Sequence, residues 1–268
     1  MENLNPNDTG MLRLCVFLGI LIVMMLAEFL VPARKAPLSR WVRWSGNLGL
    51  VVMGALVARV VLPMTLVGIA MWAQTQEVGL FYWLEFNTTL AIIASLVLLD
   101  MAIYWQHYWF HHVPFLWRFH QVHHADAHVD TTTGLRFHPV EIAMSLVIKS
   151  IIVLALGVPA LAVLIFEVAL NGFAMFNHAN IRLPQKWDKR LGYVLITQRI
   201  HRIHHSQISS ESNSNFGFSV SWWDRLFGTY ISCGQKTDET IDIGQRAFPA
   251  TKQNANLLNL LLMPFQRQ

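Results

Sequence analysis

The sequence is poor in charged residues and in cysteine. Asp, Glu, Lys and Arg make up 13% of its 268 residues, about half of the roughly 25% found in ordinary soluble domains. The two cysteines, Cys15 and Cys233, lie far apart and give no reason to expect a disulfide or a thiolate metal site. The net charge of +4 is modest and its basic residues are confined to particular loops, so we expect no nucleic-acid partner.

Apolar residues take the place of the missing charge. Hydrophobic residues make up 54% of the chain, and the mean hydropathy is +0.39. A helix that spans a bilayer needs about 20 apolar residues. Five stretches meet or approach that length, and they cover about residues 11–32, 47–73, 88–106, 140–157 and 159–176. The sequence therefore predicts an all-α, multi-pass transmembrane helical bundle.

The last two stretches meet at Gly157-Val158-Pro159, a sequence that breaks a helix. We expect a helical hairpin there, which either spans the membrane or forms a shallow re-entrant loop. Lys149 and Glu167 stand at similar distances from the turn, so a hairpin would place them at similar depth. We expect these two side chains to form an ion pair, in preference to a catalytic role.

The basic residues predict the orientation in the membrane. They gather in the 33–46 loop and after residue 181, whereas the loop at 74–87 has no Lys or Arg. By the positive-inside rule, the N-terminus lies outside and the 33–46 loop, the 107–139 segment and the C-terminal region lie in the cytoplasm. No Lys or Arg precedes the first apolar stretch, so we expect a retained anchor in place of a cleaved signal peptide. A bacterial inner membrane is the expected location, with the endoplasmic reticulum as the alternative.

Histidine is concentrated in one part of the chain. All 12 histidines fall between residues 107 and 205. The segments "RFHQVHHAD" and "RIHRIHHSQ" are near copies with HxxHH spacing, and an earlier pair is four residues apart. The members of these three boxes are His107 and His111, His120, His123 and His124, and His201, His204 and His205. Such spacings place the rings on one face of a helix.

These histidine boxes predict a metal site. Imidazole is neutral when it binds a metal, so eight or more rings can share a site without accumulating charge. A zinc ion takes three or four protein ligands, so this number suits two metal ions. Imidazole suits zinc, copper, iron and nickel alike, and the boxes alone do not select among them. The boxes lie at or beyond the inner ends of apolar stretches, which predicts a histidine-rich cap on the cytosolic side.

Several segments, in order, resemble the fatty acid hydroxylase/sterol desaturase superfamily of membrane-bound diiron oxygenases. They are "DMAIYWQHYWFHHVPFLWRFHQVHHAD", "TTTGLRFHPVE", "FNHANIRLP", "TQRIHRIHHS" and "SNFGFSVSWWDRLFGTY". The similarity covers about residues 96–231, whereas the N-terminal stretches match only in hydropathy. It implies N-terminal transmembrane helices over 1–95, a catalytic domain over 96–235 that includes the membrane hairpin, and a C-terminal tail over 236–268.

The resemblance also implies which side chains hold two iron ions. It assigns the eight box histidines and adds His178 as an intermediate ligand, with His138 as a candidate tenth ligand or as a residue beside the ligands. Acidic and amide side chains are expected to orient ligand imidazoles through the distal ring nitrogen. The candidates are Asp100, Asp130, Glu141, Asp224 and Asn215. Asp100 is favoured by its position seven residues before His107, on the same helical face.

By the same resemblance, the expected reaction is O₂-dependent hydroxylation of an unactivated C–H bond of a lipid such as a sterol or a fatty acyl chain. Desaturation and the cleavage of an ether lipid are related alternatives. Electrons are expected from a separate protein, resembling cytochrome b5 or a ferredoxin, with its reductase. The reason is that the single His-Pro pair, His138-Pro139, lacks the Gly-Gly of a fused cytochrome b5 haem motif.

Two readings from other classes fit less well. A metal carrier or channel would have metal-binding side chains distributed along its spans, and here they gather at one end. An inactive lipid-binding relative would be expected to lack a box histidine, and none is missing.

Overall fold

The computed structural model describes residues 6–266, which are built from helices and connecting loops. The long helices are α1 (Pro6–Leu30), α2 (Arg40–Val61), α5 (Thr88–His112), α7 (Pro139–Leu156) and α8 (Ala160–His178). The shorter ones are α3 (Leu66–Thr75), α4 (Leu80–Trp83), α6 (Pro114–His124), α9 (Gln185–Leu191), α10 (Gln198–His204), α11 (Ser209–Ser212), α12 (Trp222–Phe227) and α13 (Leu257–Leu262). Two 3₁₀ turns cover Thr133–Leu135 and Met263–Phe265. No strand occurs within 6–266, so the all-α prediction is confirmed.

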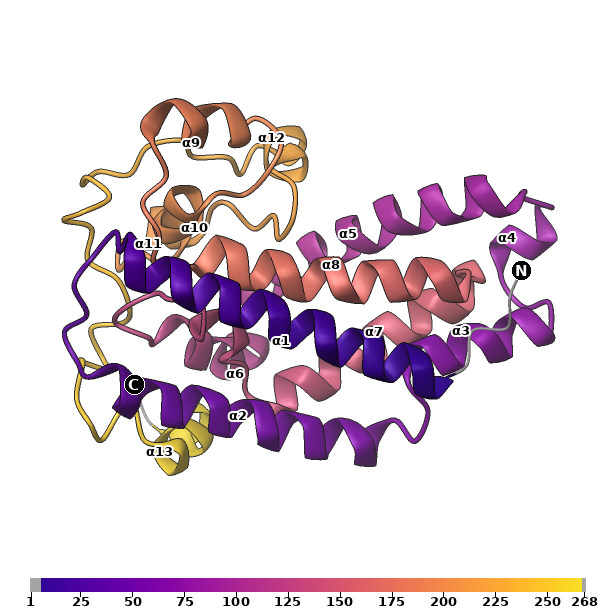
Figure 1. The fold of residues 1–268 in the computed structure, drawn as a ribbon, viewed down its shortest axis with the longest axis horizontal. Coiled ribbons are helices and arrows are strands. Elements are labelled where there is room, and N and C mark those ends of the chain that lie inside the picture. Colours follow the sequence, from indigo (N-terminus) through magenta and orange to yellow (C-terminus); the bar gives the residue numbers. More distant parts are fainter. Residues whose placement is uncertain (1–5, 267–268) are drawn as a thin grey trace.

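Five helical segments are long and apolar enough to cross a membrane. They are Gly10–Leu30, Arg40–Trp83, Thr88–His112, Pro139–Leu156 and Ala160–His178. Figure 1 shows the long helices running lengthwise, with α9, α10, α11 and α12 gathered at one end. The predicted multi-pass bundle with a polar cap is therefore present, and its composition is that of an integral membrane protein.

The second predicted stretch is not a single helix. α2 ends at Val61 and α3 begins at Leu66, with Leu62 in an extended conformation between them. Pro63 explains the break, because proline lacks an N–H group and disfavours a helical conformation in the residue before it. Thr65 then caps α3 by accepting a hydrogen bond from the Gly68 amide at 3.1 Å.

The last two long helices diverge from their turn. α7 packs along α2, α8 packs against α1 and α5, and α3 contacts both α7 and α8. The buried apolar cluster around α3 includes Leu66, Leu99, Val153, Val163 and Phe166. This packing separates the two helices that the sequence suggested would form a close hairpin.

The expected ion pair between Lys149 and Glu167 is therefore wrong. The Glu167 carboxylate pairs instead with Arg13 of α1, with 3.0 Å between Arg13 Nη1 and Glu167 Oε2. The sequence alone could not show this, because it does not reveal that α1 lies beside α8.

Two glycines allow the turn between α7 and α8 to contact another turn. Gly157 ends α7 with a left-handed φ of 69°, and Gly79 has a φ of 118°. A Cβ atom on Gly79 would stand 2.1 Å from the Gly157 nitrogen. A Cβ atom on Gly157 would stand 2.7 Å from both the Tyr82 ring and the Val78 carbonyl oxygen. Glycine is required at both positions for this contact.

Replacing Gly157 by alanine should destabilise the bundle. The left-handed conformation costs about 1–2 kcal/mol for an alanine, and crowding against Tyr82 and Val78 adds about 1–3 kcal/mol. Thermal unfolding of the purified protein in detergent should therefore occur at a clearly lower temperature in Gly157→Ala than in wild type. Gly19→Ala is the control, because a Cβ atom there would meet nothing within 4 Å. Equal unfolding temperatures for Gly157→Ala and wild type would refute this role of the turn.

Candidate metal centre

Four helices bring the histidine boxes together. The first box lies on the last two turns of α5, and Pro114 begins α6, which carries the second box. α8 ends at His178, and α10 carries the third box, whose final residue, His205, caps the helix. Proline at the first position of α6 has no N–H group to satisfy, so it can reverse the chain directly after α5. The nine predicted ligands therefore meet at one end of the bundle.

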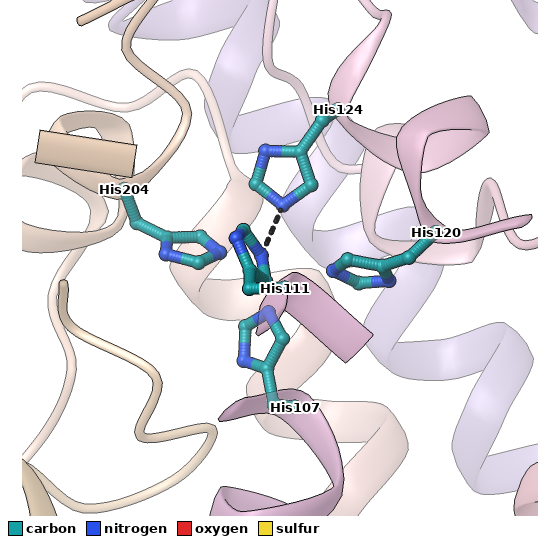
Figure 2. A group of neighbouring side chains, drawn as sticks. All are labelled: His107, His111, His120, His124 and His204. Carbon is teal, nitrogen blue, oxygen red and sulfur yellow. Dashed lines mark hydrogen bonds between the residues drawn. The ribbon is translucent and has the colours of Figure 1, made fainter. Parts of the chain in front are cut away.

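The nine histidines form two groups, each with one ring nitrogen per residue within 4.8 Å of those of the other members. The larger group contains His107, His111, His120, His124 and His204, and the smaller one contains His123, His178, His201 and His205. Figure 2 shows the five rings of the larger group converging on a common centre. Neither group includes an acidic residue or a cysteine.

Each HxxHH triplet contributes to both groups. On α6, the i and i+4 members, His120 and His124, belong to the larger group, and His123 belongs to the smaller one. On α10 the arrangement is reversed, because His201 and His205 belong to the smaller group and His204 to the larger one. Neither triplet therefore serves one group alone. The two near-identical triplets join the two sites to each other.

Backbone carbonyl groups orient three of the rings. The Nδ1 atoms of His107, His178 and His204 lie 2.8, 2.7 and 2.7 Å from the carbonyl oxygens of Phe216, Ala174 and Ser214, respectively. A carbonyl group only accepts, so each Nδ1 carries the proton and donates. The Nε2 lone pair of each ring is thereby left for another partner.

A carboxylate orients a fourth ring in the same way. Glu141 Oε1 lies 2.7 Å from His120 Nδ1, and Glu141 stands in the first turn of α7. Metal-binding histidines commonly donate their second ring nitrogen to a carboxylate, which fixes the tautomer and the ring orientation. Glu141 thus occupies the position that the sequence analysis expected of an orienting group.

The nitrogen atoms suit metal ions. The Nε2 atoms of His107, His120 and His204 are buried and have no hydrogen-bond partner among the described residues. In the smaller group, His178 Nε2 lies 2.8 Å from His201 Nε2 and 3.1 Å from His123 Nε2. Separations of about 3 Å are those of nitrogens that share a metal at about 2.0–2.1 Å. The residues present therefore fit two metal ions bound by imidazole.

Three of the rings outside the membrane spans, those of His124, His204 and His205, are neutral at ordinary pH. Burial lowers the pKa of His204 to about 3. Burial first, and then the neighbouring imidazoles, hold the pKa values of His124 and His205 well below the ordinary histidine value. A neutral imidazole is the form that binds a metal, so protons do not compete for these nitrogens near neutrality.

Asp224 and Asn215 act on the ligands through the backbone. Asp224 accepts hydrogen bonds from the amides of Phe216 and Gly217 at 2.7 and 2.8 Å. Asn215 has a left-handed φ of 53°, and its side-chain amide donates to the carbonyl oxygens of Ile200 and Ile231. The two carbonyl groups that orient His204 and His107 stand on either side of Asn215. These residues therefore hold the loop that orients two ligands, and neither touches a ring.

Three other candidates lie away from the histidine groups. Asp100 accepts a hydrogen bond from the Trp223 indole at 2.8 Å, and no hydrogen bond joins it to a box histidine. His138 caps α7 by accepting from the Val140 amide, and its Nε2 atom lies 3.3 Å from the Leu261 carbonyl oxygen. It belongs to neither metal group. Asp130 pairs with Arg43 at 2.5 Å.

A buried ionic cluster beneath the centre was not anticipated from the sequence. Arg43, which the sequence analysis counted among the orienting charges, is 2% exposed. Its Nη2 atom lies 2.8 Å from Asp126 Oδ2. Burial would raise the pKa of Asp126, but Arg43 and then Arg136 outweigh it and hold that pKa below its usual range. The cluster holds the 126–133 loop, which connects α6 to the 3₁₀ turn that contacts α8.

That 3₁₀ turn contacts the backbone that orients His178. A Cβ atom on Gly134 would lie 2.4 Å from the Ala174 carbonyl oxygen, the acceptor for His178, and 3.1 Å from His178 Nδ1. Only glycine leaves room for this approach. A sequence signal existed in Gly134 within "TTTGLRFHP", although its role depends on α8 lying across it.

A single substitution of a histidine in either group should remove the metal ion of that group. Wild-type protein reconstituted with ferrous iron should bind two ions per chain, and His124→Ala and His205→Ala should each bind about one, as measured by mass spectrometry of total metal. His112→Ala is the matched control, because His112 neighbours His111 but bonds to the Tyr108 carbonyl oxygen and belongs to neither group. Two ions in both ligand variants would contradict the division of ligands.

Comparisons with known proteins agree with this arrangement. The sequence model of the fatty acid hydroxylase family matches residues 92–229. The chain is 29% identical over 181 residues to the ornithine lipid hydroxylase OlsE of Rhizobium tropici, covering 66% of this chain and 51% of that protein. It is 32% identical over 139 residues to the alkylglycerol monooxygenase of Danio rerio, covering 49% of this chain and 28% of that protein. The alkylglycerol monooxygenase of Homo sapiens is 25% identical over 142 residues, with 51% and 30% covered.

The chain thus spans about half the length of the first relative and less than a third of the other two. No solved structure gives a significant match. The family match covers half of the chain and all nine grouped histidines. The chain therefore belongs to the fatty acid hydroxylase family.

Proposed function

We propose that this chain is an O₂-dependent membrane lipid hydroxylase that holds two iron ions in its histidine groups. One observation carries the proposal. A cavity of about 400 Å³ lies within the helical bundle and reaches histidines of both groups. The histidines that line it are His107, His120, His123 and His201. A substrate in this cavity would lie beside both metal positions.

The walls of the cavity suit a lipid. Apolar side chains come from α2, α5, α7 and the loop before α7, and they include Leu50, Ile103, Phe110, Phe137 and Ile142. The C–H bonds of a lipid offer no polar group to hold, so apolar contact and shape must position the reacting carbon. A lipid bound between these walls would displace water from the histidine end, which would limit side reactions.

Each set of residues has a distinct part in the proposed reaction. Bound iron would activate O₂ for the hydroxylation of an unactivated C–H bond. The balance is R–H + O₂ + 2 e⁻ + 2 H⁺ → R–OH + H₂O. Glu141 and the carbonyl groups of Phe216, Ala174 and Ser214 hold the ligand rings in one tautomer. Fixed ligands keep the metal positions constant relative to the cavity.

The electrons would come from a separate protein resembling cytochrome b5 or a ferredoxin, with its reductase. A surface pocket next to the third box is lined by more basic than acidic side chains, which favours an acidic donor. The basic ones are Arg182, Lys189, Arg199, Arg202 and Lys236, and the acidic ones are Asp188, Asp238 and Glu239. With such a donor, the cap would lie in the cytoplasm and the N-terminus outside, which is the orientation that the positive-inside rule predicts. The membrane would be a bacterial inner membrane or the endoplasmic reticulum.

Oxidation of an ether lipid is a second candidate reaction, and it is supported by the relatives. Two of the relatives are alkylglycerol monooxygenases, so hydroxylation next to an ether oxygen is the alternative substrate chemistry. Desaturation would use the same centre. A metal carrier is disfavoured, because the nine histidines form two closed groups at one end of the bundle and are not spread along its length.

Lipid analysis under ¹⁸O₂ tests the proposal. Cells that supply an electron donor and express wild-type protein should contain a lipid with one labelled oxygen, as detected by mass spectrometry of lipid extracts. His204→Ala should lower that product at least a hundredfold, because the larger group loses a ligand. His112→Ala should leave it unchanged.

Each other outcome has a defined meaning. Loss of two hydrogens without label would replace hydroxylation by desaturation. A labelled fatty aldehyde released from an ether lipid would select the second reaction. Identical extracts from wild type and His204→Ala, in cells with a competent donor and candidate lipids, would refute the oxygenase function.

A further inference from the structure

The cavity that reaches the histidines also has a charged end. Arg13 of α1, Lys149 of α7 and Glu167 of α8 line it together with the histidines. Glu167 precedes His178 on α8 by three turns, a rise of about 16 Å. Lys149 follows Glu141, the partner of His120, by slightly more than two turns, about 12 Å. The charged side chains therefore stand well away from the metal groups along the same cavity.

The charges at this end are not balanced. Arg13 Nη2 donates a hydrogen bond to Glu167 Oε1 at 3.1 Å, and Arg13 Nη1 lies 3.0 Å from Glu167 Oε2, which accepts no hydrogen bond among the described residues. Lys149 has neither a hydrogen bond nor an ion pair among the described residues. One carboxylate thus faces two basic side chains, and the pair that it forms leaves out Lys149.

A purely structural role explains only part of this arrangement. The Arg13–Glu167 pair ties α1 to α8 and is neutral as a unit. Lys149 adds a second basic group to a part of the cavity that also holds Ser145 and Asn171, and a basic group within a membrane span is costly unless it has an acceptor. It lines the cavity, so a bound molecule can supply that acceptor.

We infer that the charged end of the cavity binds an anionic oxygen group of the substrate, a carboxylate or a phosphate, through Lys149 with Arg13 beside it. The substrate is then an amphiphile whose chain extends from Lys149 towards the histidines. The distance between Lys149 and the histidine groups selects which carbon of the substrate lies at the metal positions. The binding site stands on the geometry alone, and only the selection of the carbon rests on the proposed function.

Binding measured without turnover tests the inference. Radiolabelled palmitic acid is bound to the purified full-length protein in a scintillation proximity assay, with methyl palmitate and hexadecyl phosphate as competitors. Wild type should bind the acid at least tenfold more tightly than its neutral methyl ester. Lys149→Met should weaken binding of the acid about tenfold and leave the ester unchanged, and Lys149→Arg should restore it. Lys186→Met is the control, because Lys186 is exposed and lies outside the cavity.

The competitors separate the two sources of the anionic group. Stronger displacement by hexadecyl phosphate than by unlabelled palmitic acid identifies a phosphate-bearing lipid, and the reverse identifies a carboxylate. Equal affinity of wild type for acid and ester would overturn the inference even if Lys149→Met failed to fold. So would a folded Lys149→Met variant that kept the preference for the acid. Because no turnover is needed, a failure of the oxygenase proposal would not affect this result.

Discussion

The structure depends on burying eight imidazole rings, and partly burying a ninth, with their nitrogens turned towards two common points. Each buried nitrogen without a partner costs about 1–3 kcal/mol, and several of these nitrogens have no hydrogen-bond partner among the described residues. Carbonyl groups and Glu141 hold four of the rings in place, and burial keeps the rings of His124, His204 and His205 neutral. Metal ions would supply the missing partners, so the surrounding protein is arranged for a state that an ion completes.

This constraint accounts for the packing around the centre. Rings that face inward need acceptors on their outer side. These acceptors come from three segments, which are the turn around Asn215, the last turns of α8 and the start of α7. Those segments in turn need support. Asp224 holds the first, Gly134 packs against the second, and the cluster of Arg43 and Asp126 fixes the loop leading to Gly134. The cavity then joins this centre to the apolar interior of the bundle.

The sequence predicted well what depends on local periodicity. Apolar length located the spans, and the HxxHH triplets together with the pair four residues apart identified eight of the nine grouped histidines. Resemblance to the family was needed for His178, which has no second histidine beside it. Features that depend on which helices become neighbours were not predictable. Arg43 looked like a loop charge until α2 was found beside the 126–133 loop, and Glu167 was assigned to Lys149 because α1 could not be placed. Asp100 lies on the expected face of α5, but its carboxylate accepts a hydrogen bond from the Trp223 indole and none from a box histidine.

The central claim is that two metal ions occupy two groups that share both HxxHH triplets. Anomalous X-ray scattering at the iron absorption edge, from crystals of iron-reconstituted protein, tests it most directly. The account predicts two separate peaks, one among His107, His111, His120, His124 and His204 and one among His123, His178, His201 and His205. A single peak, or a pair of peaks in which each triplet binds only one ion, would contradict it.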